Sequence, residues 1–180
     1  LGDLGWYTLR FILWVMNYNK PLAVTGRLLN SSCRSDSPKS VPTEFSGEVL
    51  FNGVSASFYC SFLTEHQQLA HLSGSKGNLR IDDFVLPYFG NRIGFQSSNA
   101  EFDCDSCDFR MERKEATHYV DEYASSHISS QETNLFRTFS SLVLEGKPNS
   151  HWPMITRLTQ ELMIACMESA EKGGTEIALS

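Results

Sequence analysis

The sequence is short of basic residues and of cysteines, and each shortage excludes a class of protein. It has 15 Lys and Arg against 21 Asp and Glu, which gives a formal net charge of -6. No run of Lys and Arg exceeds two residues, so binding of nucleic acid by phosphate neutralisation is not expected. Five cysteines in 180 residues are too few, and odd in number, for a disulfide scaffold. We therefore expect a reducing, cytoplasmic compartment and no nucleic-acid partner.

Hydrophobic runs of membrane-spanning length are also missing. The apolar run at residues 11–16 has six residues, whereas a bilayer-spanning helix needs about 20. The first residues have no basic segment followed by a cleavage site, so they do not resemble a signal peptide. The chain begins at Leu1 rather than at Met, and we interpret it as a piece of a longer protein. With 41% hydrophobic and 12% aromatic residues, we expect a folded domain without a membrane anchor.

The N-terminal residues have the pattern of a helix. Apolar side chains repeat with the 3.6-residue period over residues 4–18, and Asp3 stands where an N-cap belongs. The apolar residues cover nearly the whole circumference of this helix, which predicts burial on several sides.

A β-hairpin is predicted in the first third of the chain. The pair Asn52-Gly53 separates two alternating runs, residues 45–51 and 54–62, and predicts a turn with both residues at positive φ. The second run places apolar residues on one face. Its other face is uncharged and weakly polar, and it carries Ser55, Ser57, Tyr59 and Ser61. Such a face either meets solvent or packs flat against a second copy of the sheet.

The rest of the chain has the patterns of strands followed by helices. Strands are predicted near 22–29, at 67–73 in the same sheet, near 78–82, within 95–110 and at 177–179. The Ser- and Pro-rich segment 30–42 is predicted to be a flexible loop. Two helices end at Gly146 and Gly173. We expect residues 1–180 to form one α+β domain, an open, mainly antiparallel β-sheet with helices packed on one face.

Asp3 and Tyr7 are the best candidates for chemistry. They are four residues apart, so both project from one face at the start of the first helix. A phenol beside a carboxylate at a helix N-terminus is able to donate a proton to a developing alkoxide. Arg10, nearly one turn further on, is placed to assist. The alternative is that Asp3 only caps the helix and Tyr7 only packs, and the pattern alone favours that alternative.

The other motifs do not indicate a functional site. Cys104 and Cys107 form a single C-x-x-C, but a structural zinc site needs four ligands, and no His is near them in the sequence. In an extended strand the two thiols point to opposite faces. The sequence has no H-E-x-x-H, no G-x-S-x-G and no glycine-rich nucleotide motif. We predict no metal site and no nucleotide site within these residues.

Several short motifs occur together in a familiar order. The opening residues 2–7, G-D-L-G-W-Y, resemble the G-D-x-G-x-Y motif of the Gfo/Idh/MocA oxidoreductases. Segments 74–82, 131–139 and 152–169 also fit that family. The chain therefore resembles the C-terminal domain of this family, which includes glucose–fructose oxidoreductase, inositol dehydrogenase and dimeric dihydrodiol dehydrogenase.

The resemblance implies the substrate-binding and dimerisation domain of an NAD(P)-dependent oxidoreductase. A Rossmann domain with a catalytic Lys would precede it and hold most of the NAD or NADP, so we predict that residues 1–180 alone are inactive. Tyr7 matches the acid/base of the Tyr-type members, and Asp3 matches the aspartate that organises the site. We place Trp6 and Arg10 as substrate contacts; Arg10 stands where many members have Asp.

Two hypotheses follow. In the first, the whole protein interconverts an alcohol, such as a sugar or diol, and a carbonyl by hydride transfer, and it forms a homodimer through the open sheet face. In the second, the chain is a non-catalytic dimerisation or interaction module without a cofactor site. A coding sequence for a Rossmann half upstream of Leu1 would favour the first.

Overall fold

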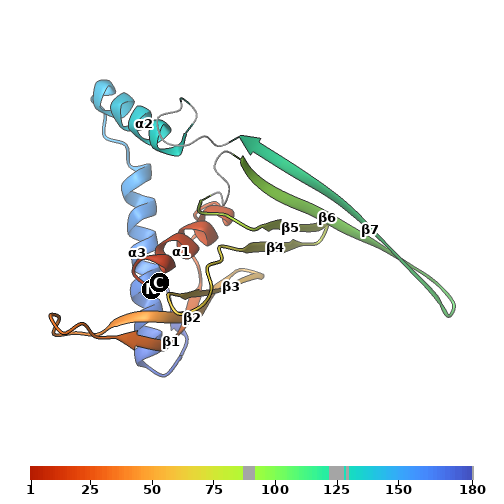
Figure 1. Cartoon of the computed structure of the whole chain (residues 1–180), viewed down its shortest axis with the longest axis horizontal. Helices are drawn as coiled ribbons and strands as arrows, with labels where there is room; N and C mark the ends of the chain where they lie inside the picture. Colours follow the sequence, from red (N-terminus) through yellow and green to blue (C-terminus); the bar gives the residue numbers. More distant parts are fainter. Residues whose placement is uncertain (87–91, 122–127, 129, 180) are drawn as a thin grey trace. The chain divides into compact units, whose positions relative to one another are not determined.

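The computed structural model describes residues 1–86, 92–121, 128 and 130–179, which fall into two compact units (Figure 1). Unit 1 joins Leu1–Glu65 to Asn149–Ser180, and unit 2 is His66–Pro148. Unit 1 holds the helices α1 (Leu4–Val15) and α3 (His151–Glu171) and the strands β1 (Ala23–Ser32), β2 (Val41–Phe51), β3 (Val54–Ser61) and β8 (Ile177–Ala178). Unit 2 holds the strands β4 (Ala70–Gly74), β5 (Gly77–Ile81), β6 (Arg92–Asp105) and β7 (Asp108–Asp121) and the helix α2 (Gln131–Glu145).

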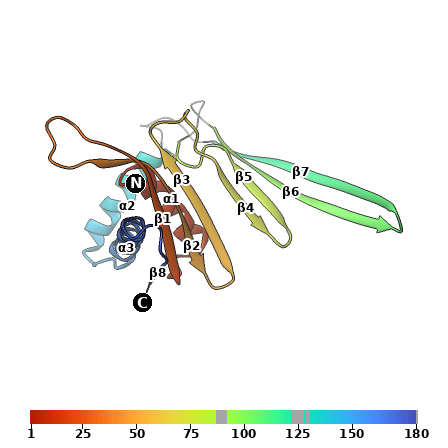
Figure 2. The same cartoon turned by 90° about the horizontal axis from the view of Figure 1, so that it is seen from below.

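Unit 1 is an antiparallel sheet covered on one face by two helices. The strand order is β3-β2-β1-β8, and every neighbouring pair is antiparallel. Helix α3 contacts β1 while α1 contacts β3 and α3, and Figure 2 shows both helices on the same side of the sheet. The core between these layers contains Leu9, Leu13, Val24, Phe45, Val49, Phe58, Leu162 and Cys166. The predicted α+β class, with an antiparallel sheet and helices on one face, is confirmed.

Alternation along the strands builds that core. In β3 the side chains of Phe58 and Cys60 are buried, and their neighbours Ser57 and Tyr59 are exposed. The rings of Phe45 and Phe58 stack with their centroids 6.1 Å apart. The predicted division of this strand into an apolar and a polar face is therefore confirmed.

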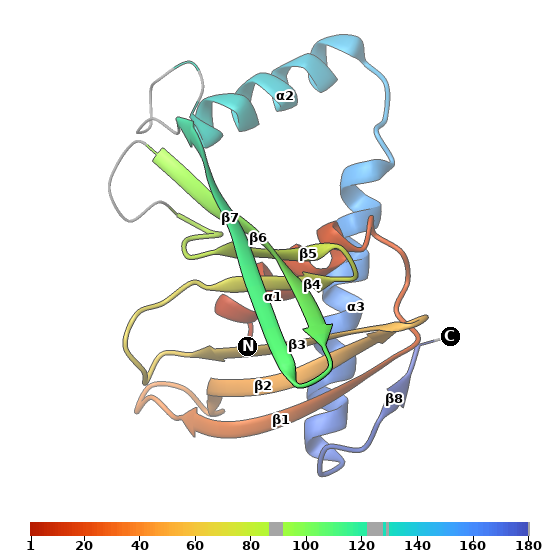
Figure 3. The ribbon, with the colours of Figure 1, turned by 90° about the vertical axis from the view of Figure 1, so that its right-hand side faces the viewer.

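Unit 2 contains a separate antiparallel sheet with the strand order β4-β5-β6-β7. The prediction that residues 67–73 belong to the first sheet is therefore wrong. The two short strands expected within 95–110 are two 14-residue strands, β6 and β7, which form one long hairpin (Figure 3). Its turn has Ser106 at a φ of 56°. Helix α2 has no buried residue, and its N-cap Ser130 accepts a hydrogen bond from the N–H of Thr133.

Several predicted boundaries move by a few residues. Helix α1 ends at Val15 rather than at residue 18, because Asn17 and Tyr18 adopt positive φ. The helix is also less buried than predicted: Trp14, on its outer side, is exposed. In the hairpin turn only Gly53 has positive φ, so the expected pair of positive φ angles is wrong. Strand pairing extends into both ends of the predicted loop 30–42, since β1 and β2 pair as far as Ser32.

The helix ends follow the sequence signals. Helix α2 ends at Gly146 in the left-handed conformation, with a φ of 63°. Helix α3 has Pro153 in its first turn and is followed by Gly173 and Gly174, both at positive φ. None of the helices in the described residues combines the length and the apolar character needed to cross a bilayer.

Candidate functional site

The first turn of α1 leaves both candidate catalytic side chains facing outward. Asp3 occupies the N-cap position, but its backbone is helical (φ -95°, ψ -79°) and its carboxylate makes no capping hydrogen bond. Only its carbonyl takes part in the turn, accepting from the N–H of Trp6 at 2.9 Å. Tyr7 is 47% exposed. The purely structural alternative, in which Asp3 caps the helix and Tyr7 packs, is therefore not what the structure has. The Asp3 carboxylate does not cap α1, and Tyr7 is not packed into the core.

The other two predicted residues lie together on the side of α1 that faces α3. The guanidinium of Arg10 lies over the Trp6 ring, with Cζ 5.4 Å from the ring centroid. Its Nη2 donates to Oγ1 of Thr156 on α3 at 3.3 Å, while its Nε is buried and has no hydrogen-bond partner. Stacking on an indole fixes the plane of a guanidinium and favours its charge. Thr156 is a member of this cluster that sequence reasoning missed, because it is 146 residues away from Arg10 in the sequence.

This arrangement supplies a proton donor and an anchored cation on one helix. Tyr7 and Arg10 are three residues apart on α1, so their side chains emerge on neighbouring parts of its surface. A phenol is able to give or take a proton, and a guanidinium presents several donors to hydroxyl, carbonyl or carboxylate oxygens. These groups are chemically suited to contact the oxygen atoms of a small polar molecule.

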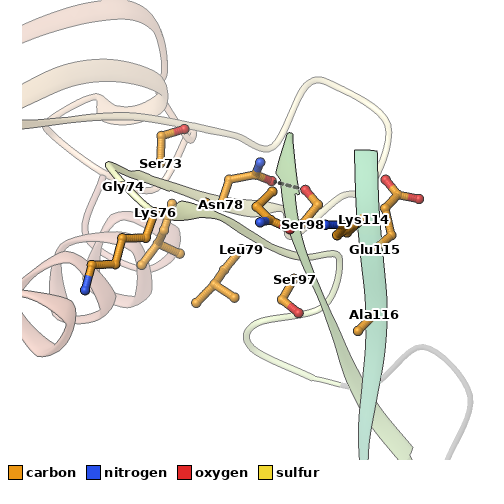
Figure 4. A pocket seen from close by; sticks show the side chains of 13 residues that line it. Ser73, Gly74, Lys76, Asn78, Leu79, Ser97, Ser98, Lys114, Glu115 and Ala116 are labelled. Carbon is orange, nitrogen blue, oxygen red and sulfur yellow. Dashed lines mark hydrogen bonds between the residues drawn. The ribbon is translucent and has the colours of Figure 1, made fainter. Parts of the chain in front are cut away.

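The structure also has a hollow away from these residues. It has a volume of about 640 Å³ and lies on the sheet of unit 2, lined by Leu72, Ser73, Asn78, Leu79, Ser97, Ser98, Lys114 and Ala116 among others (Figure 4). In Figure 4 Leu79, Ser97 and Ala116 point to one side of the sheet, and Ser73, Asn78 and Ser98 to the other. Ser98 donates to Asn78 at 2.9 Å. None of the four predicted site residues lines this hollow, and we assign no chemistry to it because it is an open depression on a sheet.

The cysteines divide into exposed and buried positions. Cys104 lies near the end of β6 and Cys107 in the turn that follows, so both sit at the tip of the hairpin, between the two strands expected around them. Both are exposed, free thiols. Cys60 and Cys166 lie in the core of unit 1, where burial raises the pKa of Cys166 to about 12 and also raises the pKa of Cys60. Within the described ranges, His, Cys, Asp and Glu side chains do not gather in groups of three that would hold a metal ion.

Comparison with known proteins identifies the fold. Scanned against protein-family models, the chain matches none. Among solved structures it is similar to an aldose-aldose oxidoreductase from Caulobacter crescentus, determined in complex with glycerol, with a TM-score of 0.62 and 17% identity over 98% of this chain and 46% of that one. It is also similar to yvaA from Bacillus subtilis, proposed to be an oxidoreductase, with a TM-score of 0.59 and 14% identity over 99% of this chain and 51% of that one.

The chain has the fold of one part of these two proteins. The resemblance inferred from the motifs is thereby confirmed at the level of the fold. The chain spans about half the length of the two solved structures. At these identities the likeness does not carry over any activity, so function has to be argued from the residues of this chain.

Proposed function

We propose that these residues form the substrate side of an oxidoreductase that interconverts an alcohol and a carbonyl, with Tyr7 as the acid/base. The observation that carries the proposal is the position of Tyr7, exposed in the first turn of α1 next to an Asp3 that makes no capping bond. Oxidation of an alcohol releases a hydride and a proton, and Tyr7 takes the proton from the hydroxyl. In the reverse direction Tyr7 returns it to the carbonyl oxygen. Asp3 orients the phenol.

Arg10 and Trp6 bind and orient the substrate in this proposal. Arg10 is held in place by the Trp6 ring and by Thr156, which lowers the entropy lost when it binds a ligand oxygen. The substrate class is a small hydroxyl or carbonyl compound of sugar or diol type. One structural neighbour supports this substrate class, since it is an aldose-aldose oxidoreductase solved with glycerol.

The hydride acceptor that the resemblance implies is NAD or NADP. A dinucleotide site is built from a parallel βαβ unit with a glycine-rich turn, whereas the strand pairs within both described sheets are antiparallel. The described residues therefore do not fit a dinucleotide. We propose that a separate nucleotide-binding domain holds the cofactor and that residues 1–180 alone do not turn over substrate.

We also propose a homodimer through the exposed face of β3, in a reducing, cytoplasmic compartment where Cys33, Cys104 and Cys107 stay free. That face of the sheet carries charged residues that the sequence of β3 alone did not show. The register places Glu44 and Glu48 of β2 beside Ser61 and Ser57 of β3. The hydroxyl of Tyr59 donates to Glu44, which gives that carboxylate a partner within the face.

The decisive experiment is the substitution Tyr7→Phe in the intact protein that carries these residues. Reduction of NAD+ or NADP+ is followed with a panel of aldoses and diols. We expect kcat to fall by about 100-fold or more while the KM for the cofactor is unchanged, because only the proton acceptor is lost. Tyr59→Phe, which removes a hydroxyl from the sheet face of unit 1, is the matched control and should leave kcat unchanged.

If Tyr7→Phe retains activity, Tyr7 is not the acid/base. If the intact protein reduces neither cofactor with any member of the panel, the alternative of a non-catalytic interaction module replaces the enzyme proposal. The two results differ in the wild-type protein, so they cannot be confused.

A further inference from the structure

The hairpin of β6 and β7 extends beyond the rest of its sheet. Strand β5 pairs with β6 only as far as Ser98, so residues 99–105 of β6 pair with β7 alone (Figure 1). We call residues 99–114 the arm. In the described sheet β7 is an edge strand, and all 14 of its residues are exposed. A long exposed edge presents a row of N–H and C=O groups that is able to pair with another strand.

One face of the arm carries an apolar patch. Phe102 lies opposite Met111 in the register, and Cys104 lies opposite Phe109. The rings of Phe102 and Phe109 stack 5.9 Å apart. The exposed fractions are 64% for Phe102, 70% for Phe109 and 75% for Met111. Adjacent exposed apolar side chains of this size mark an interaction surface.

We propose that the arm is a dimerisation element in which β7 pairs antiparallel with β7 of a second copy of this chain, about a two-fold axis at Met111. An axis normal to the sheet keeps each face of the sheet on the same side in both copies. Met111 then faces Met111 of the second copy, and every other residue faces the one equally far from Met111 in the opposite direction. The occupant of the edge is thus fixed by the sequence of β7 itself.

The side chains of β7 are complementary to themselves in this register. Arg110 faces Glu112, Asp108 faces Lys114, and Phe109 faces Arg113 of the second copy. Opposite charges and a cation beside an aromatic ring are favourable cross-strand pairs. Within the part of the chain that the structure describes, Arg110, Glu112 and Asp108 enter no ion pair. Because of the two-fold symmetry, each of these residue pairs occurs twice in the dimer.

Neighbouring registers are repulsive. With the axis at Glu112, that residue faces itself and Arg110 faces Lys114. With the axis at Arg110, Asp108 faces Glu112. Like charges directly opposite one another destabilise a strand pair. The charges of this edge therefore select one antiparallel register rather than preventing all pairing, as edge charges otherwise do.

The pairing would extend the two unit 2 sheets into one and join the two apolar patches across the axis. It does not depend on the proposed oxidoreductase activity. It also differs from the proposed dimer through the face of β3, which uses another sheet.

Cysteine cross-linking tests the axis directly. The background is the full 180-residue chain with Cys33→Ser, Cys104→Ser and Cys107→Ser, which removes the three exposed thiols. On oxidation with copper phenanthroline, Met111→Cys should give a disulfide-linked dimer as the main product. Ala116→Cys, an exposed residue of the same strand, lies five positions from the axis and should remain monomeric on a non-reducing gel. Equal cross-linking of both variants, or none of Met111→Cys, overturns the proposal even if the protein is a dimer through β3.

A charge exchange provides the second test. Dissociation constants of the dimer are measured by sedimentation equilibrium. Arg110→Glu and Glu112→Arg should each weaken dimerisation by about tenfold or more, because each creates two like-charge pairs. The double variant restores opposite charges and should return the constant to within about threefold of wild type. Lys39→Glu, in the exposed loop between β1 and β2, changes the net charge equally and should have no effect. Absence of rescue in the double variant overturns the register.

Discussion

The backbone N–H of Gly26 in β1 donates a hydrogen bond of 2.9 Å to the hydroxyl of Ser169 in α3. The same hydroxyl donates to the carbonyl of Thr175 at 2.6 Å, and Ser169 is fully buried. One side chain therefore links the sheet, the helix and the segment that leads into β8. This contact holds α3 in register over the sheet, and α3 in turn carries Thr156, the partner of Arg10.

Ser169→Ala should lower the free energy of unfolding of unit 1 by about 1–3 kcal/mol, because the buried N–H of Gly26 loses its acceptor. Urea unfolding followed by tryptophan fluorescence measures it, since Trp6, Trp14 and Trp152 all belong to unit 1. Ser57→Ala, on the exposed face of β3, is the matched control and should change the free energy by less than about 0.5 kcal/mol. Equal effects of the two variants would contradict the linking role.

Gly26→Ala should be more damaging than Ser169→Ala. A Cβ on Gly26 would lie 2.2 Å from the carbonyl oxygen of Cys166, which is backbone and has little freedom to move. We expect a loss of about 3 kcal/mol as α3 is pushed from the sheet. Gly2→Ala is the control, because a Cβ there has no atom within 4 Å. The same urea titration compares them, and a near-neutral Gly26→Ala would show that α3 is not packed directly on β1.

Local sequence patterns predicted most of the helices and strands. They did not predict which strands and helices that are distant in the sequence contact one another. The hairpin at Asn52-Gly53 was predicted because its turn and both strands are contiguous in sequence. The assignment of residues 67–73 to the wrong sheet has a physical origin: a period of two reveals a half-buried strand but not its neighbour. The rotation of Trp6 and Arg10 toward α3 was equally hidden, since their contact with Thr156 depends on how two distant helices pack.

In the candidate site, too, some features could not be predicted from the sequence. Asp3 at an N-cap position suggested a capping bond, but the helical backbone at Asp3 turns the carboxylate away from the first N–H groups. The assignment of Tyr7 as acid/base came from the motif at residues 2–7 and stays a prediction.

Phe45→Ala tests the centre of the core of unit 1. Phe45 is completely buried and stacks on Phe58, so we expect a loss of about 3–5 kcal/mol in the free energy of unfolding. Phe62→Ala, just beyond the end of β3, removes the same atoms from a side chain that is 56% exposed. Its loss should be below about 1 kcal/mol. Similar losses in the two variants would mean that the sheet and the helices do not share the core described here.

The buried thiols make the stability of unit 1 fall in alkali. Burial, and to a smaller extent the neighbouring Cys60, raises the pKa of Cys166 to about 12, whereas an unfolded thiol ionises near 8.5. Below about pH 8.5 both states keep the proton, so this group does not change the stability. Between about pH 8.5 and 12 only the unfolded chain loses it, and the free energy of unfolding falls by up to about 1.4 kcal/mol per pH unit. Urea midpoints at pH 8 and pH 10.5 measure the fall.

Cys166→Ala isolates the contribution of this thiol to the pH dependence of stability. The variant should be less stable than wild type at pH 8, because a core side chain is shortened. Its further loss on going to pH 10.5 should be smaller than that of wild type, so the two curves converge as the pH rises. Cys33→Ala, which removes an exposed thiol, should follow the wild-type curve at both pH values. Parallel curves for Cys166→Ala and wild type would show that Cys166 ionises equally in the folded and unfolded states, which a thiol of α3 buried in the core of unit 1 does not do.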